Sequence, residues 1–496
     1  MGDVPAAKVV AHHEGQGLLI DLQFPGDELL GAAGAVLQQP ADEGDGHRVA
    51  MRHHVVAGGE RTGLVDEESE QVLDQGNRFH PLLGGVRYPA HCWTTGRDTS
   101  TVRSGGSHAM DVNGHKRAPL RVAIIGTGAR SDYLYGPLLR GLPGEVQLVA
   151  VWGRSAASAE RLGRSLAVPW YTNLDRLVQQ TAPQIGIVSV SSRANGEVGR
   201  LAVEHGLHVL LETPIAARLD EADAIIAAAA QRGVKIEVAE QFHRRPLEQL
   251  KLRLIASGIF GRVHSSFNDF AGHGYHGVSV LRSYLGFDAL PAQVTGAVAR
   301  YGLAPYSSRG SGNGTVDSET QEHGIIEFAD GRLGIFHWTS VGYDCPQRWW
   351  RSSRFLAERG MGVTVGVGLD VEERLSVLSA DGQAPLFLTI ERRWERVDGG
   401  ALVALVAHSG DPTTPVLRWD NPFAPAVKGH GSQWHDDEIG VASCLMSLVE
   451  AVREGTEPTY GAVQARRDQE IVLAMRQSAR EGGRPVRLPL DPATQA

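Results

Sequence analysis

The fold of this chain is decided by Leu120-Arg-Val-Ala-Ile-Ile-Gly-Thr-Gly-Ala-Arg-Ser131, a short β-branched apolar run that leads into a glycine-rich turn. A parallel strand covered on both faces has this composition, and residues 133–142 continue with a helical pattern. Gly126 permits the tight turn, Gly128 permits close approach of a pyrophosphate, and the next helix directs free amides towards the anion. Ser131 replaces the third glycine of the fingerprint. The stretch predicts a dinucleotide site, the alternative being a plain strand-to-helix turn.

Composition restricts the class of protein. The 496 residues allow two or three domains, at ~150 residues each. The formal net charge is -9 without long blocks of like charge, which argues against nucleic-acid or anionic-membrane partners. Cys92, Cys345 and Cys444 form no C-x-x-C pair and indicate a reducing compartment without a disulfide framework. No apolar run approaches the ~20 residues of a membrane span, so we expect a cytoplasmic protein.

Residues 1 to about 117 differ from the rest of the chain. They are rich in Gly, His, Asp and Glu and show no sustained helical or strand period. The eight histidines from His12 to His108 lack ligand spacing, so no metal site is predicted. Met110 closely precedes the first strand. Our hypothesis is that the functional polypeptide starts near Met110 and that residues 1–109 are a mis-assigned start or a disordered extension.

Strand and helix patterns alternate from residue 118 to about 240. This alternation predicts a doubly wound, mostly parallel sheet with right-handed crossovers, the Rossmann arrangement. The expected strands are 122–125, 146–152, 168–171, 185–190, 208–211 and 235–239, and the expected helices are 156–165, 173–180, 195–205 and 219–231.

The end of the second strand bears on the type of cofactor. An NAD site usually has Asp or Glu there to bind the ribose 2′-hydroxyl, but this strand ends in Val151-Trp-Gly-Arg-Ser155. Gly153 opens space, Arg154 can pair with a phosphate as a planar fork, and Ser155 can donate to it. NADP(H) is therefore preferred and NAD(H) remains possible. The alternative is that Arg154 is a solvated turn residue.

Four segments carry a family resemblance. They are Gly126-Thr-Gly128, Gly206-Leu-His-Val-Leu-Leu-Glu-Thr-Pro-Ile-Ala216, Gly274-Tyr-His-Gly-Val-Ser-Val-Leu-Arg-Ser-Tyr-Leu-Gly286 and Ser447-Leu-Val-Glu-Ala-Val-Arg-Glu-Gly455. With them and the C-terminal segments Ala474-Met-Arg-Gln-Ser-Ala479 and Val486-Arg-Leu-Pro489, residues 117–490 resemble the Gfo/Idh/MocA oxidoreductases. The resemblance implies a Rossmann dinucleotide-binding domain at 118–240. It also implies an α/β domain at 241–496 with a large open, mostly antiparallel sheet that lines the substrate site and often mediates oligomers.

The chain departs from the family pattern at several site positions. Thr213 stands where members typically carry the lysine of Glu-Lys-Pro, and it cannot supply a positive charge. Gly272 and Ser279 occupy positions where the family tends to place Asp, and Asn195 occupies that of a frequent His. His276 alone keeps the catalytic pattern.

Residues 241–496 show mainly strand patterns. Asp330-Gly331 is a hairpin signal, so an antiparallel sheet is expected. The proline pairs between Asp411 and Pro425 indicate an irregular excursion. The expected strands are 263–270, 293–301, 319–328, 333–340, 355–364, 374–379 and 386–394, and the expected helices are 248–257, 437–454 and 464–481.

The richest polar cluster is Asn268-Asp-Phe-Ala-Gly-His-Gly-Tyr-His276. A histidine has the unperturbed pKa nearest neutrality, so His276 could remove a hydroxyl proton during hydride transfer, with His273 or Tyr275 sharing the relay. The alternative is that these residues order a glycine-rich loop and bind sugar hydroxyls without proton transfer.

These observations together predict a nicotinamide-dependent oxidoreductase acting on a hydroxyl carbon of a sugar, polyol or related compound. Two alternatives stay open: a redox-neutral, NAD-dependent glycoside hydrolase, and a non-catalytic relative that kept the cofactor site. We expect a homo-oligomer that pairs through the C-terminal sheet. The predicted cofactor-binding residues are Gly126, Thr127, Gly128, Ala129, Arg130, Arg154, Ser155, Ser191, Asn195, Glu212, Thr213 and Pro214.

Overall fold

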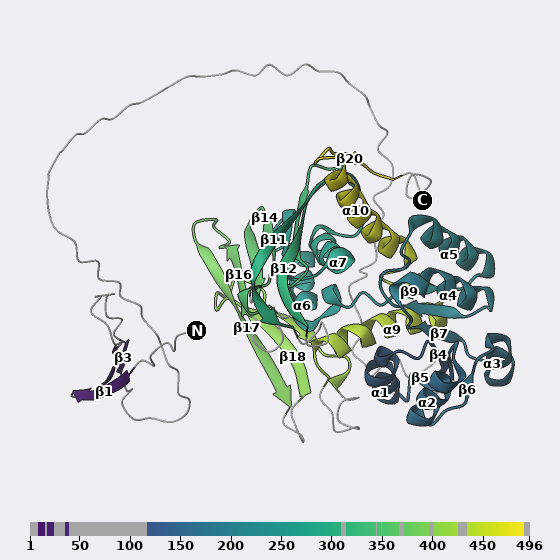
Figure 1. Ribbon diagram of the computed structural model, residues 1–496. Coiled ribbons are helices and arrows are strands. Elements are labelled where there is room, and N and C mark those ends of the chain that lie inside the picture. Colours follow the sequence, from purple (N-terminus) through teal and green to yellow (C-terminus); the bar gives the residue numbers. More distant parts are fainter. Residues whose placement is uncertain are drawn as a thin grey trace, which may run out of the picture. The chain divides into compact units, whose positions relative to one another are not determined.

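The computed structural model describes residues 8–14, 17–23, 35–38, 117–308, 314–343, 345–348, 350–366, 372–395, 401–424 and 434–490. The chain divides into two compact units, Met1–Trp93 and Thr94–Ala496 (Figure 1). In the first unit three strands form an antiparallel sheet where the sequence predicted no secondary structure: β1 (Lys8–Glu14), β2 (Gly17–Gln23) and β3 (Ala35–Gln38). Met110 and most of residues 1–116 lie outside the described residues.

The second unit begins with the predicted Rossmann domain. Its six-stranded sheet has the order β6-β5-β4-β7-β8-β9, and every neighbouring pair is parallel. The strand order reverses between β4 and β7, the point at which such folds bind ligands. The strands are β4 (Leu120–Ile125), β5 (Val146–Trp152), β6 (Trp170–Tyr171), β7 (Ile185–Val188), β8 (His208–Leu211) and β9 (Ile236–Val238).

Helices cover both faces of this sheet, which explains why β4 and β7 are almost continuously apolar and buried. The predicted parallel sheet is confirmed, with helix boundaries within a few residues of those expected. The helical segments are η1 (Ser131–Tyr135), α1 (Gly136–Arg140), α2 (Ala156–Leu166), α3 (Leu174–Thr181), α4 (Ser192–Glu204) and α5 (Leu219–Arg232).

The C-terminal domain is organised around an 11-stranded sheet in the order β19-β18-β17-β16-β15-β14-β10-β13-β12-β11-β20. Only the β10–β13 pair is parallel among the described pairs, so the mostly antiparallel prediction is confirmed. The strands are β10 (Val263–Asp269), β11 (Pro291–Ser307), β12 (Thr315–Phe328), β13 (Leu333–Thr339), β14 (Ser352–Ala357), β15 (Gly360–Val365), β16 (Glu372–Leu378), β17 (Pro385–Glu395), β18 (Ala401–His408), β19 (Leu417–Asp420) and β20 (Val486–Arg487).

Three helices pack on one face of this sheet: α6 (Pro246–Ala256), α7 (Gly274–Leu285) and α10 (Ala462–Arg480) (Figure 1). The short helix η2 (Phe242–Arg244) links the two domains. The long helix α9 (Asp436–Glu454) packs on β8, β9 and η2. These contacts join the two domains of the second unit. No helix in the described part of the chain is long and apolar enough to span a bilayer.

Three expectations for this domain were wrong in detail. The single strand expected at 355–364 is the hairpin β14–β15, which turns before Gly360, where a Cβ would collide with the Ser376 carbonyl. Part of the expected irregular excursion is β19, which pairs with the unpredicted strand β18. The alternative interpretation of residues 268–276 as a glycine-rich loop is wrong from Gly274 onward, where the unpredicted helix α7 begins.

Candidate functional site

The glycine turn after β4 has the geometry that a dinucleotide requires. Gly126 has φ +121°, and a Cβ there would collide with the Ser189 carbonyl oxygen, so only glycine fits. A Cβ at Gly128 would meet no heavy atom within 4 Å, so the backbone is open on that side. The Ser131 hydroxyl donates to Gly126 O at 3.0 Å and holds the turn. This buried contact gives Ser131 a structural role in place of the third glycine.

An open pocket of about 330 Å³ lies beside this turn. It is located at the carboxyl ends of β4, β7 and β8, at the point where the strand order reverses. The structure brings together most of the residues predicted to bind cofactor. The lining residues are Thr127, Gly128, Ala129, Arg130, Ser189, Val190, Ser191, Glu212 and Thr213.

Glu212 is held rigidly at the edge of this pocket. Its Oε1 accepts hydrogen bonds from Arg130 Nε and, at 2.6 Å, from the Tyr135 hydroxyl. Burial, and then the charge of Glu212, raise the pKa of Tyr135 well above its usual value, so the phenol remains a donor. Sequence reasoning missed Tyr135 and did not anticipate the Arg130–Glu212 ion pair. The two donors position the carboxylate directly before Thr213.

Asn195 and Pro214 do not line the pocket. They belong to the structure that supports the lining residues Glu212 and Thr213. The side chain of Asn195 is fully buried, and its Nδ2 donates to the backbone oxygens of Glu212 and Pro214, the latter at 2.6 Å. An amide with two donors suits this task, because it ties two carbonyls of the segment together. Asn195 therefore orders the Glu212–Pro214 segment.

Arg154 and Ser155 are exposed at the end of β5. Ser155 is the N-cap residue of α2, and its carbonyl accepts from the Ser158 hydroxyl at 3.0 Å. The expectation that Gly153 opens space for a phosphate is wrong, because a Cβ there would collide with the Thr127 side chain. Gly153 instead lets Thr127 pack against α2. The Arg154 side chain remains in solvent.

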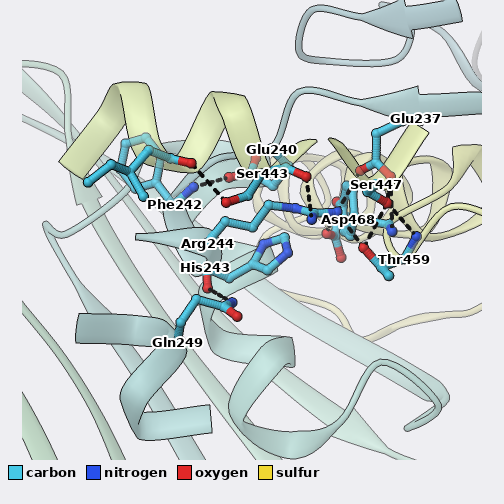
Figure 2. Close-up of polar contacts among 12 residues, drawn as sticks. Glu237, Glu240, Phe242, His243, Arg244, Gln249, Ser443, Ser447, Thr459 and Asp468 are labelled. Atoms are coloured by element: carbon cyan, nitrogen blue, oxygen red, sulfur yellow. Dashed lines mark hydrogen bonds and ion pairs between the residues drawn. The ribbon is translucent and has the colours of Figure 1, made fainter. Parts of the chain in front are cut away.

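A buried dyad forms at the first turn of α7. His276 Nδ1 lies 2.6 Å from Glu240 Oε2, and both side chains are buried. The other carboxylate oxygen, Oε1, accepts from the Phe242 amide at 3.1 Å (Figure 2). The His276 ring also stacks on Phe242, with 4.3 Å between ring centroids. The His276 ring is thereby held at one edge by Glu240 and on one face by Phe242.

Glu240 supplies the carboxylate that Gly272 and Ser279 lack. It lies two residues after the end of β9, whereas the family pattern would place acidic residues near the histidine in sequence. Sequence reasoning missed Glu240, although a carboxylate at the end of a buried strand in Ala239-Glu-Gln241 was an available signal. The Ser279 hydroxyl interacts with this carboxylate and donates to His276 O at 3.1 Å.

Burial controls the ionisation of the histidine cluster. It raises the pKa of Glu240 to about 8 and lowers the pKa of His276 to about 3. It also lowers the pKa of His273 to about 4. All three shifts favour the neutral forms, as expected for groups removed from water. At neutral pH the Glu240–His276 dyad therefore has no net charge and holds two protons, one in the hydrogen bond between Oε2 and Nδ1 and one on Nε2.

The dyad is continuous with the pocket. Tyr275 and His276 interact electrostatically with Glu212 and Arg130, and the Thr213 hydroxyl acts on the Tyr275 phenol. Burial raises the pKa of Tyr275 to about 12, so it stays protonated. His273 lies 4.7 Å from the His276 ring and its Nδ1 is 2.6 Å from the Tyr343 hydroxyl. The three predicted catalytic side chains thus cluster beside Thr213.

Ion pairs anchor the segment that carries Glu240. Glu237 accepts from Arg244 Nη2 at 2.7 Å and from the Ser447 hydroxyl at 2.7 Å (Figure 2). Arg244 also donates to Thr459 Oγ1 at 2.8 Å and to Ser443 O at 3.2 Å. These contacts tie β9 and η2 to α9 on both sides of Glu240. The carboxylate is therefore presented from a rigid crossover between the two domains.

Comparison with known proteins identifies relatives of the nucleotide-binding domain. Residues 120–240 match the family described as "Oxidoreductase family, NAD-binding Rossmann fold", the Gfo/Idh/MocA family. An uncharacterized oxidoreductase of Schizosaccharomyces pombe is 30% identical over 123 residues, which cover 24% of this chain and 33% of that protein. The galactose/lactose metabolism regulatory protein of Saccharomyces cerevisiae is 25% identical over 170 residues, 32% of this chain and 38% of that protein. The chain thus spans about a third of the length of these relatives.

Solved structures share the fold over a longer range. An NAD-binding oxidoreductase from Klebsiella pneumoniae has a TM-score of 0.57 at 17% identity, covering 75% of this chain and 100% of that one. The WlbA dehydrogenase from Bordetella pertussis, in complex with NADH and UDP-GlcNAcA, has a TM-score of 0.52 at 16% identity with the same coverage. The match over residues 120–240 shows that the nucleotide-binding domain has the NAD-binding Rossmann fold of the Gfo/Idh/MocA oxidoreductases.

The residues present fit a dinucleotide. The open side at Gly128, the strand ends that form the pocket and the amides at the start of η1 are where a pyrophosphate binds in this fold. Thr213 lines the pocket and lies beside the histidine cluster, where it interacts with Tyr275.

Proposed function

We propose that this protein is a nicotinamide-dependent oxidoreductase that acts on a hydroxyl carbon of a sugar, polyol or related compound. The observation that carries the proposal is the buried Glu240–His276 dyad beside the Thr213 end of the dinucleotide pocket. A bound nicotinamide supplies or accepts the hydride. The chain orients the pyrophosphate on the glycine turn, fixes the segment after Glu212, and offers His276 as proton donor or acceptor for the reacting oxygen.

A turnover panel tests this proposal. Purified protein is incubated with NAD⁺ or NADP⁺ and a set of sugars, polyols, sugar acids and nucleotide sugars, and the reduced-nicotinamide absorbance is followed. Steady, substrate-dependent reduction is the expected result. Glycoside cleavage without net absorbance change would instead identify the redox-neutral hydrolase, and either that result or binding without any turnover would overturn the proposal.

One observation favours a second candidate, a cofactor-binding protein without catalysis. Thr213 replaces the family lysine, and the described residues near it offer neutral donors, Tyr275 and the dyad, at neutral pH. The regulatory protein of Saccharomyces cerevisiae named above shows similarity over part of the chain. Nucleotide binding at micromolar concentration with no turnover across the panel would favour this candidate.

We propose that Arg154 makes the protein accept NADP(H) in addition to NAD(H). The guanidinium is exposed at the end of β5, where the ribose 2′-position lies in this fold. Arg154→Ala is expected to weaken NADPH binding roughly tenfold, the value of one lost charge-assisted pair, and to leave NADH binding unchanged. Fluorescence titration with both nucleotides measures the effect. Arg164→Ala, on the exposed end of α2, is the matched control, and equal losses for both nucleotides would contradict the assignment.

We also propose that a second copy of the chain covers the open face of the C-terminal sheet. Strand register places four exposed apolar side chains on the face opposite α7: Ile325, Leu333, Met361 and Phe387. A large apolar patch on a sheet favours self-association. Sedimentation equilibrium is expected to give a dimer or larger assembly that Phe387→Asp with Ile325→Asp dissociates. Val416→Asp, at an exposed residue outside the strands, is the control; a monomeric wild type would refute the proposal.

A further inference from the structure

We propose that Glu240 and His276 form a two-residue proton relay. His276 Nε2 exchanges a proton with the reacting oxygen, and Glu240 supplies or takes up a proton at His276 Nδ1 to compensate. Glu240 is a positioning residue in this relay, because it acts through His276 and does not touch the substrate. The inference rests on the proposed oxidoreductase function and names the source of the proton.

The geometry defines the roles of the two ring nitrogens. Nδ1 is committed to Glu240 Oε2 at 2.6 Å, and the ring face is held by Phe242. Nε2 lies on the opposite ring edge, and within the described residues it makes no hydrogen bond with the protein. The neighbouring Tyr275 side chain interacts with the hydroxyl of Thr213, which lines the pocket. Nε2 is therefore the nitrogen that can meet a substrate oxygen.

Counting protons defines two states of the dyad. With one shared proton between Oε2 and Nδ1, the ring carries N–H at Nε2 and is a donor. When the dyad has lost one proton, the remaining proton lies on Nδ1, the carboxylate accepts from Nδ1–H, and Nε2 is an acceptor. The hydrogen bond to Glu240 thus decides whether His276 works as acid or base.

The reaction balances through these states. In reduction, a reduced nicotinamide dinucleotide supplies the hydrogen and electron pair that form the new C–H bond. The carbonyl π electrons move to oxygen, which takes the proton from Nε2, and the shared proton of the dyad moves to Nδ1. The dyad is left with one proton fewer, which water restores. Oxidation is the reverse, and water accepts the proton that leaves the dyad.

The surroundings keep the proton on the dyad at neutral pH. Burial raises the pKa of Glu240 to about 8, whereas the Phe242 amide and the Ser279 hydroxyl lower it. Because the pKa of Glu240 is raised, this carboxyl stays protonated up to about pH 8. The state in which Nε2 is a donor therefore prevails below about pH 8, and the state in which Nε2 is an acceptor prevails above it. The ionisable or charged groups that interact with the two residues are Arg130, Glu212, His243, Arg245, His273, Tyr275, Asp437, Cys444, Tyr460 and Asp468.

Glu240→Gln tests the relay, because the amide keeps the shape and cannot pass on the proton. Since Phe242 N holds Oε1, the glutamine NH₂ is expected to donate to Nδ1 and lock N–H at Nε2. Turnover is expected to fall roughly 10- to 100-fold in both directions with little change in KM, a part of what general acid–base catalysis contributes. Glu240→Asp is expected to retain part of the turnover that Glu240→Gln loses. The wild-type pH limb near 8 should disappear in the Gln variant.

A readout independent of activity follows the His276 ring itself. Full-length protein labelled with ¹⁵N in histidine is titrated by NMR from pH 6 to 9, and the His276 signal is assigned with the His276→Asn variant. The wild-type ring is expected to change from Nε2–H to Nδ1–H as pH passes about 8; the Glu240→Gln ring is expected not to change. An identical titration in both proteins would overturn the relay. If the wild-type His276 ring changes tautomer near this pH but the protein shows no turnover, the proposed function is wrong and the proton coupling between Glu240 and His276 is supported.

Ser279→Ala gives a second, milder test should Glu240→Gln fail to fold. Its hydroxyl lowers the pKa of Glu240, so removing it is expected to move the wild-type transition to higher pH. Ser283→Ala is the matched control one turn later on α7, where the hydroxyl bonds to Val280 O at 2.7 Å. A transition that stays in place in Ser279→Ala, or moves equally in the control, would contradict the assignment.

Discussion

His276→Asn is expected to lower kcat by roughly 10²- to 10⁴-fold in both directions, the usual contribution of a general acid–base residue. Asparagine retains one donor for Glu240 and fits the space of the imidazole, so the fold should survive. It cannot exchange a proton near neutral pH. Steady-state kinetics with the best substrate of the panel, at saturating nucleotide, measures the effect.

The loss should fall on kcat while nucleotide affinity stays at the wild-type value. The reason is spatial: the dinucleotide pocket is built from β4, β7 and β8, whereas His276 belongs to α7. His264→Asn is the matched control, because this histidine is exposed on β10 and its Nδ1 contacts the hydroxyl of its neighbour Ser265. Turnover within about threefold of wild type in His276→Asn would show that His276 transfers no proton.

Sequence patterns sufficed for the Rossmann half because its signals are local. Each strand is a short apolar run. Each helix has an apolar stripe, and its ends are determined by capping residues adjacent to it in the sequence. Examples are the Asn173 side chain that caps α3 and Gly233 at the end of α5. The pocket residues follow from the same segments, since strand ends in a parallel sheet converge on one edge.

The helix α7 was missed because its environment hides its periodicity. Every residue from Gly274 to Leu285 except Tyr275 is buried. A helix enclosed on all sides shows no polar stripe, and Gly274 and Gly277 lower its intrinsic helix propensity. A Cβ at Gly277 would collide with Asn268 and Gly272, so tertiary packing requires the glycine that local propensity disfavours.

The acidic partner of His276 was missed for a different reason. Glu240 is 36 residues away along the chain, and the two meet only because η2 places the end of β9 against α7. No spacing rule in one sequence encodes this meeting. The Arg130–Glu212 ion pair, 82 residues apart, is hidden in the same way. The residues of the pocket could therefore be predicted from the sequence. The pairing of Glu240 with His276 could not, because it depends on how η2 connects the two domains.

Arg282→Met is expected to lower the free energy of unfolding by about 3–5 kcal/mol, the cost of removing one partner of a buried ion pair. Arg282 Nη1 donates to Asp468 Oδ1, and both side chains are fully buried. The Arg282 Nη2 atom also donates to Phe287 O at 2.9 Å and to Gln464 Oε1 at 2.7 Å. Without the guanidinium, Asp468 keeps only the Tyr460 hydroxyl as a donor among these groups and is left a buried, uncompensated charge. Urea denaturation followed by fluorescence measures the loss.

Two further variants separate charge from packing. Arg282→Met with Asp468→Leu replaces the pair by apolar side chains and is expected to recover most of the loss, because an apolar pair needs no desolvation of charge. Arg262→Met, which breaks the exposed pair with Asp330, should change stability little. Because α7 carries His276 in its first turn and Arg282 in its last, the single Arg282→Met variant should also weaken the dyad. Retained stability in Arg282→Met would mean that α7 is held by apolar packing alone, and the position of His276 would then not depend on the α7–α10 ion pair.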